Sequence, residues 1–321
     1  MKNKTIGILM GGYSDEFNIS MQSGEVVYRT LKNYFNCYKI QILKNKWHLI
    51  DGNNKYVIKQ KSFSVVERPS IKFDCIFNVI HGAPGEDGQM KKYFDKLKIP
   101  ITGCDSYTSE LTYDKIKCLE FLSSRGINTA DSFIILKNDN FNVDEVISKV
   151  GLPCFVKASR SGSSFGIYKA KSKKELLKSI ELSFKLDTKV LIESSIEGRE
   201  FSVGVISYQG EIKVLPITEI VSKNDFFDYN AKYEGEAQEI TPAKISNNLK
   251  SELNLISKSI FIILGLKGFS RSEFIVNENG IFFLEINTIP GLTNESILPQ
   301  QALKANISLL ELFKNAIHEV I

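Results

Sequence analysis

The sequence predicts an open α/β domain over the first hundred residues, followed by α+β regions built from antiparallel strands. Two observations predict this fold class. Strand-like apolar segments alternate with helix-like segments up to about residue 105, which is typical of an α/β domain. Beyond that point the pattern changes to strands joined by short turns, with single helices between them. We therefore expect three units, over residues 1–104, 105–187 and 188–321.

The N-terminal unit is expected to place two glycine-bearing segments at the carboxyl ends of strands, where open α/β sheets bind ligands. The predicted strands and helices are Thr5–Met10, Ile19–Leu31, Cys37–Leu43, Phe73–Ile80, Gln89–Leu97 and a short strand near Ile99–Thr102. GGYSDEFNIS follows the first strand, with Ser14 or Asp15 available to cap the helix, and HGAPGEDG follows the third. Neither segment fits G-x-G-x-x-G and no P-loop motif occurs, so both of those nucleotide folds are disfavoured.

The middle of the chain begins with a helix predicted from Thr108 to about Arg125, which Gly126 ends. The predicted elements that follow are Ser132–Leu136, helix Val143–Val150, Pro153–Ala158, Ile167–Ala170, helix Ser172–Leu186, Lys189–Glu193 and Glu200–Ser207. The Gly/Ser-rich turn RSGSSFG can offer backbone and hydroxyl donors to a triphosphate, although such turns also serve as plain connections. Asp225–Thr241 is a long polar and aromatic loop, a type that is usually functional.

The most informative stretch is Gly268–Pro299. Phe269–Val276 and Ile281–Asn287 read as two strands, and Asn279-Gly280 is a strong hairpin signal in a loop of residues 278–280. That loop places two carboxylates opposite each other, Glu273 and Glu285, with Arg271 opposite Asn287 on the same face. Two carboxylates and an amide suit Mg²⁺. The plain alternative is an exposed polar face with chance charges.

Composition limits the class of protein. Hydrophobic residues make up 43% and charged residues 24% of the 321 residues, which is typical of a globular, core-forming chain. The net charge of +4 is small and no basic block occurs, which disfavours a nucleic-acid-binding module. The N-terminal apolar run ends in glycines and is too short for a signal peptide or a membrane span. The five cysteines form no CxxC pair, which favours a reduced, cytoplasmic compartment.

Seven segments, taken in order, resemble the D-alanine–D-alanine ligases of the ATP-grasp superfamily. They are GGYSDEFNIS, HGAPGEDG, Tyr113-Asp114-Lys115, FVKASRSGSSFG, Glu193 with Gly198-Arg199-Glu200, FFDYNAKY, and SRSEF…FLEINTIPGLTNESILP. The resemblance implies an N-terminal α/β domain followed by a two-lobed ATP-grasp domain whose antiparallel sheets grip ATP. It also implies an ATP-dependent ligase that makes D-alanyl-D-alanine for peptidoglycan precursors through an acyl phosphate, with two Mg²⁺ or Mn²⁺ ions. A homodimer is what the family suggests.

The same resemblance implies a role for each matching residue. Those implied to bind ATP are Lys115, Lys157, Ser163, Ser164, Glu193, Glu200 and Lys232. Those implied to hold the metal ions are Glu273, Glu285 and Asn287. Those implied to act in catalysis are Glu16, Ser163, Lys232, Tyr233 and Arg271. Those implied to bind the amino-acid substrates are Glu16, His81, Arg271, Gly291 and Ser296, the last at the start of the final helix.

Two positions depart from the family pattern. Phe17 stands where many members have His or Arg, and Glu273 stands where most have Asp. Tyr233 after Lys232 favours an amine as the second substrate. A ligase that joins D-alanine to D-serine or D-lactate stays open as an alternative. A second alternative is a non-catalytic ATP-binding protein, which the presence of Arg271 and of all three metal positions disfavours.

Overall fold

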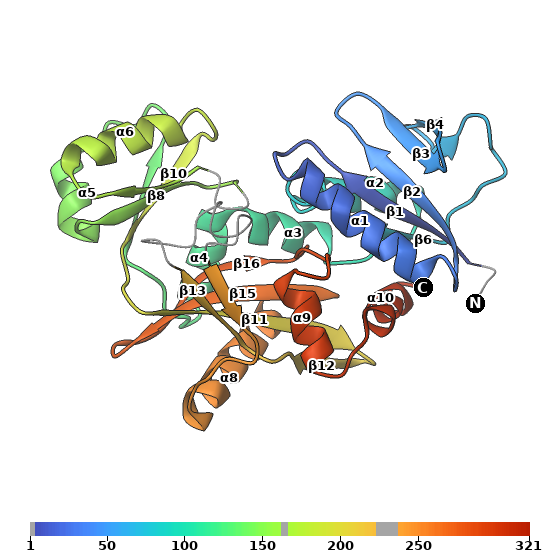
Figure 1. The fold of residues 1–321 in the computed structure, drawn as a ribbon. Coiled ribbons are helices and arrows are strands. Elements are labelled where there is room, and N and C mark those ends of the chain that lie inside the picture. Colours follow the sequence, from blue (N-terminus) through green and yellow to red (C-terminus); the bar gives the residue numbers. More distant parts are fainter. Residues whose placement is uncertain (1–3, 162–165, 223–236) are drawn as a thin grey trace.

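A computed structural model describes residues 4–161, 166–222 and 237–321, and three sheets form three lobes in it (Figure 1). The N-terminal sheet has the order β5-β4-β3-β2-β1-β6, in which β1 runs parallel to β2 and β6 and the other neighbours are antiparallel. Its strands are β1 (Thr5–Gly11), β2 (Asn36–Ile42), β3 (Trp47–Asp51), β4 (Asn54–Lys59), β5 (Ser64–Val65) and β6 (Cys75–Asn78), with helices α1 (Phe17–Leu31) and α2 (Gln89–Leu97).

Two details of this sheet differ from the prediction. The residue at the N-cap of α1 is Glu16, which makes no side-chain capping bond, and Ser14 instead donates to the carbonyl of His81. The short strand predicted near residues 99–102 is a single parallel bridge between Ile101 and Ile76. Ser14 therefore connects the two glycine-bearing segments and does not cap the helix.

The central sheet is antiparallel throughout, in the order β7-β10-β8-β9. Its elements are β7 (Ser132–Leu136), α5 (Val143–Val150), β8 (Cys154–Ala158), β9 (Ile167–Ala170), α6 (Lys173–Ser183) and β10 (Lys189–Ser194). Buried residues of both helices pack on the sheet, and both helices lie on one side of it (Figure 1). Because β10 belongs to this sheet, the chain leaves it after Ser194, later than a division at residues 187/188 would place it.

The C-terminal sheet is also antiparallel, in the order β14-β13-β11-β15-β16, with β12 beside β11. Its elements are β11 (Arg199–Tyr208), β12 (Glu211–Val214), β13 (Thr218–Ser222), β14 (Ala237–Ile240), α8 (Asn247–Ile263), β15 (Phe269–Asn277), β16 (Gly280–Asn287), α9 (Ile297–Lys304) and α10 (Leu309–His318). The prediction that Ser296 precedes the last helix is therefore wrong, because α10 follows α9. Phe313 of α10 packs against Phe77 of β6 with ring centroids 5.6 Å apart, which joins this lobe to the N-terminal sheet.

The helix predicted from Thr108 to Arg125 is two helices, α3 (Ser106–Tyr113) and α4 (Lys115–Ser123), separated at Asp114. Their buried side chains share a core with Phe201 and Phe274 of the C-terminal sheet, and both helices lie over β16 (Figure 1). The segment therefore packs with the C-terminal sheet, although it precedes the central one in sequence. None of the described helices is both long and apolar enough to cross a membrane.

Candidate active site

The β15–β16 hairpin brings together the four polar side chains that its sequence predicts. Arg271 pairs with Asn287, and Glu273 pairs with Glu285. Arg271 Nε donates to Glu273 Oε1 at 2.8 Å, so a cation lies beside the more buried of the two opposed carboxylates. The prediction that these four residues share one region of the sheet is confirmed.

The turn of this hairpin is tighter than predicted. Asn277 pairs with Gly280, so the turn holds two residues, Glu278 and Asn279, and not three. The register then shifts beside Glu273, where Leu284 is an extra residue on β16. This bulge compensates for the shorter turn, and the predicted pairing at the carboxylates is reached by a different route.

A cavity of about 410 Å³ lies above the carboxyl end of β16. Eight predicted site residues line it: Glu16, His81, Lys115, Arg271, Glu285, Asn287, Gly291 and Ser296. Lys157, Glu193, Glu200 and Glu273 are described but do not line it. Ser163, Ser164, Lys232 and Tyr233 lie outside the described residues. The structure therefore gathers residues from all three predicted units around one space.

Three ion pairs, which we call the site pairs, organise the charges here. They are Arg271–Glu273, Lys115–Glu285 and Lys157–Glu193, with nitrogen–oxygen distances of 2.8, 3.3 and 2.6 Å. Burial lowers the pKa of Lys157, but the Glu193 carboxylate outweighs burial and holds that pKa above its usual value. Each of the three cations thus lies beside a carboxylate, and Lys157 stays charged although it is largely desolvated.

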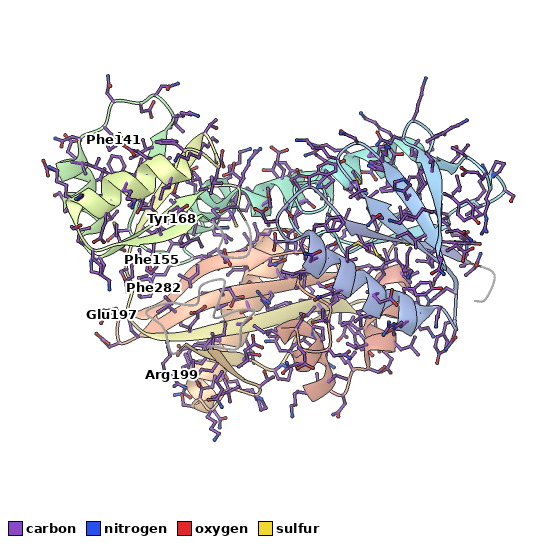
Figure 2. The ribbon with its side chains drawn as sticks, turned by 45° about the horizontal axis from the view of Figure 1, so that its top comes forward. Phe141, Phe155, Tyr168, Glu197, Arg199 and Phe282 are labelled. Carbon is purple, nitrogen blue, oxygen red and sulfur yellow. The ribbon has the colours of Figure 1, made fainter. Side chains whose placement is uncertain are left out.

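Lys157 and Glu193 lie on the central sheet, where Phe155 pairs directly with Glu193. Figure 2 labels Phe155 on β8 and Phe282 on β16, where the central and C-terminal sheets approach each other. Glu200 lies near the start of β11, on the C-terminal side of the same region. This arrangement offers an aromatic ring, a buried cation and carboxylates between two sheets.

The carboxylates of the hairpin fit a hard cation. Glu273 is 5% exposed, and its Oε2 has no hydrogen-bond partner among the described residues. Glu285 lies opposite it, and Asn287 Oδ1 accepts from the backbone N–H of Ile289, which fixes the amide. A buried carboxylate oxygen without a donor, together with a second carboxylate and an amide oxygen, is the set that Mg²⁺ prefers.

His81 is buried, and both of its ring nitrogens have partners within the protein. Nδ1 lies 2.7 Å from the carbonyl of Ile289, so Nδ1 carries the proton and donates. Nε2 then accepts from the Ser23 hydroxyl at 3.2 Å, and Ser23 accepts from the N–H of Leu292 at 3.1 Å. Burial lowers the pKa of His81, consistent with a neutral ring. His81 therefore fixes the loop after β16, and Ser23, which gives no signal in the sequence, completes that contact.

Glu86 lines the site, whereas the sequence indicates only an acidic residue just before a helix, with no role in the site. Its side chain lines the cavity, and Oε2 accepts from the N–H of Gly82 at 2.7 Å. Burial, and then repulsion from Glu16, raise its pKa to about 8. The position of Glu86 just before α2 is also typical of a helix-capping acid, so sequence alone could not separate the two roles.

Ser296 precedes α9 and faces the cavity. Its hydroxyl makes no bond to the first turn and lies 2.7 Å from the Thr293 hydroxyl. A Cβ at Gly291 would come within 2.7 Å of Ser296 Oγ, so glycine permits the close approach of the two segments. The start of α9 therefore offers an anion the Ser296 hydroxyl and the backbone N–H groups of Ile297 and Leu298.

Comparison with known proteins identifies the class. Residues 5–104 match the family described as D-ala D-ala ligase N-terminus, and residues 121–318 match D-ala D-ala ligase C-terminus. The chain therefore belongs to the D-alanine–D-alanine ligase family, and the ATP-grasp fold class predicted from its motifs is confirmed.

Individual relatives agree over nearly the whole chain. A D-alanine--D-alanine ligase of Flavobacterium johnsoniae is 54% identical over 98% of both chains. The VanG D-Ala:D-Ser ligase of Enterococcus faecalis has a similar structure, with a TM-score of 0.85, 31% identity and coverage of 98% of this chain and 99% of that one. A Bacillus anthracis D-alanine--D-alanine ligase solved with ATP has a TM-score of 0.80 and 27% identity, covering 98% of this chain and 96% of that one.

Proposed function

We propose that this enzyme joins two D-alanines into D-alanyl-D-alanine for peptidoglycan precursors, with conversion of ATP to ADP and phosphate. The curated relative at 54% identity and the two family matches support the activity. The observation that carries the mechanism is the hairpin, on which Arg271, two carboxylates and an amide meet beside the cavity.

The first half-reaction transfers the γ-phosphoryl group. The carboxylate of the first D-alanine attacks the γ-phosphorus, the bond to the bridging oxygen of ADP breaks, and an acyl phosphate forms. Lys115 and Lys157, which now pair with Glu285 and Glu193, would neutralise phosphate oxygens once ATP displaces those carboxylates. Glu273, Glu285 and Asn287 would hold Mg²⁺ or Mn²⁺, which supplies further positive charge at the phosphates.

The second half-reaction forms the peptide bond. The amine of the second D-alanine attacks the acyl carbon, an oxyanion develops, and phosphate leaves as the carbonyl re-forms. Arg271 lines the cavity with its Nε fixed by Glu273, and its guanidinium would stabilise that oxyanion. The carboxylate of the second D-alanine fits the start of α9, at Ser296 and beside Gly291.

Further roles rest on the family resemblance alone. Glu16, which lines the cavity, would position substrate together with Ser163 and Tyr233. Ser164 and Lys232 would contact ATP phosphates, and Glu193 and Glu200 would bind adenine and ribose. The homodimer and the cytoplasmic location stay predictions.

The test is to separate the products after incubation with ATP, Mg²⁺ and D-alanine, while measuring phosphate release. We expect D-alanyl-D-alanine and one phosphate per peptide bond, and loss of both with Arg271→Ala. Parallel reactions offer D-serine or D-lactate as the second substrate, because a D-Ala:D-Ser ligase is among the similar structures. Absence of product from D-alanine alone would refute the proposal, and preference for D-serine would support the alternative.

A further inference from the structure

The break between α3 and α4 places a buried charge at the junction of two lobes. Asp114 is both the C-cap residue of α3 and the N-cap residue of α4, and its backbone is extended, with φ −87° and ψ 101°. Its side chain is 0% exposed. A buried carboxylate is retained only where it is well hydrogen-bonded, so its partners indicate its purpose.

The partners of Asp114 lie mainly on the other lobe. Ser159 donates its hydroxyl to Oδ1 at 2.7 Å, and Arg160 donates Nε to Oδ2 at 3.2 Å. The N–H of Lys117 also donates to Oδ1, at 3.2 Å, which is the capping bond of α4. Burial alone would raise the pKa of Asp114, but these donors outweigh burial and hold the pKa below its usual value. The side chain is therefore a carboxylate that binds across the lobes.

The same junction fixes Lys115. Its backbone N–H donates to the carbonyl of Ser159 at 3.0 Å, and its ammonium donates to the carbonyl of Ser161 at 2.7 Å. Ser159–Ser161 leave the end of β8, in the central sheet, whereas α4 packs with the C-terminal sheet. Asp114 bonds to Ser159 and Arg160, and the Ser161 carbonyl accepts from the Lys115 ammonium, which lies 3.3 Å from Glu285.

We propose that Asp114 is a positioning residue for nucleotide binding, which sets the place of the Lys115 ammonium by fixing Ser159–Ser161 against α4. The proposal rests on the phosphate-binding role proposed above for Lys115. Asp114 touches neither nucleotide nor amino acid and acts through these neighbours. Without that charge the segment keeps its bonds within the central lobe, such as Ser159 N–H to the Lys189 carbonyl, but loses its charged bond to α4. The Lys115 ammonium then has a less defined position. Ser296, the residue proposed to bind the second D-alanine, bonds to Thr293 and to no member of this network among the described residues.

The test is Asp114→Asn, which keeps the side-chain shape and the acceptor for Ser159 but removes the carboxylate that faces Arg160. We expect the dissociation constant for ADP with Mg²⁺, measured by calorimetry, to rise about tenfold because a buried charge-assisted bond is lost. The KM for ATP rises with it, while the KM for D-alanine stays within about twofold. Asp144→Asn is the matched control, since it removes a carboxylate that pairs with Lys173 on the surface of the central lobe.

Unchanged ADP binding in folded Asp114→Asn would overturn the proposal, as would an equal loss of ADP and D-alanine affinity. If that variant does not fold, Ser159→Ala decides by the same criteria, because it removes the 2.7 Å bond and leaves the charge in place. Direct ADP binding separates this inference from the proposed activity. A parent enzyme that binds ADP but makes no dipeptide would refute the activity and leave the role of Asp114 to be judged by binding.

Discussion

Replacing Glu86 by glutamine is expected to stabilise the protein at alkaline pH but not at acidic pH. Glu86 is buried in the wall of the cavity, and its Oε2 accepts a hydrogen bond from the N–H of Gly82. Burial, followed by repulsion from Glu16, raises its pKa from 4.5 to about 8. Glutamine keeps the acceptor for Gly82 and has no proton to release, so it imitates the neutral carboxyl at every pH.

The size of the effect follows from the pKa. Below pH 4.5 the carboxyl is protonated in both states, so it contributes no pH dependence. Between pH 4.5 and about 8 the unfolded chain releases a proton that the folded protein keeps, and stability falls as the pH rises. Above that window the penalty is complete, at most about 5 kcal/mol for a change of 3.5 pKa units. If half of that free energy is realised, the melting temperature changes by on the order of 5 °C.

Thermal unfolding at about pH 4, below that window, and at about pH 8.5, above it, measures this pH dependence. The melting temperatures of Glu86→Gln and the parent should coincide at the lower pH, and the variant should be higher by several degrees at the upper pH. Glu67→Gln makes the same change at an exposed position and serves as the control. If the difference between Glu86→Gln and the parent were the same at both pH values, the raised pKa would be wrong.

Three further changes test the site. Lys157→Met leaves the Glu193 carboxylate buried without its cation, so it should lower the free energy of unfolding, measured by urea titration, by about 3–5 kcal/mol. Adding Glu193→Leu to that variant should recover most of the loss. Glu285→Gln should raise the Mg²⁺ concentration for half-maximal turnover by about tenfold, with a parallel loss of bound Mn²⁺ in electron paramagnetic resonance. Gln301→Leu removes buried bonds to the Ser202 carbonyl and the Thr218 hydroxyl, and should cost about 1–3 kcal/mol by thermal unfolding without changing bound Mn²⁺.

The sequence predicted correctly those helices and strands for which the hydrophobic period and the flanking turn residues indicate the same bounds. Gln89–Leu97 and Val143–Val150 have the predicted bounds, and the pairing of Glu273 with Glu285 follows from side-chain alternation. The three-residue loop that was predicted to set this pairing was wrong, because the turn has two residues. A bulge costs little on an antiparallel hairpin, and opposed polar side chains give no sign of it in the sequence. The helix break at Asp114 was missed for a similar reason, because Asp114 bonds to Ser159, which lies 45 residues away in the sequence.

The site was predictable only where residue type limits the chemistry. Two carboxylates opposite each other on paired strands indicate a cation between them, so the hairpin site could be found from its own residues. Glu86 and Ser23 could not, since their roles depend on burial and on partners from distant segments, as the contact between Ser23 and Leu292 shows. Motif resemblance supplied the remaining assignments, and for the residues outside the described ranges it is the only support.

The site pairs have a consequence for ligand binding. A phosphate that binds Lys115 would draw the ammonium away from the Glu285 carboxylate, which is 32% exposed. That step should be easier when a metal ion replaces the ammonium there. The same reasoning applies to Glu273, whose second oxygen lacks a donor among the described residues. We therefore expect ADP to bind at least tenfold more weakly without Mg²⁺, about 1.4 kcal/mol, and Glu285→Gln to reduce that difference, because its amide carries no charge for the metal ion to neutralise. Equal ADP affinity with and without Mg²⁺ in the parent would show that the pairs do not exchange partners.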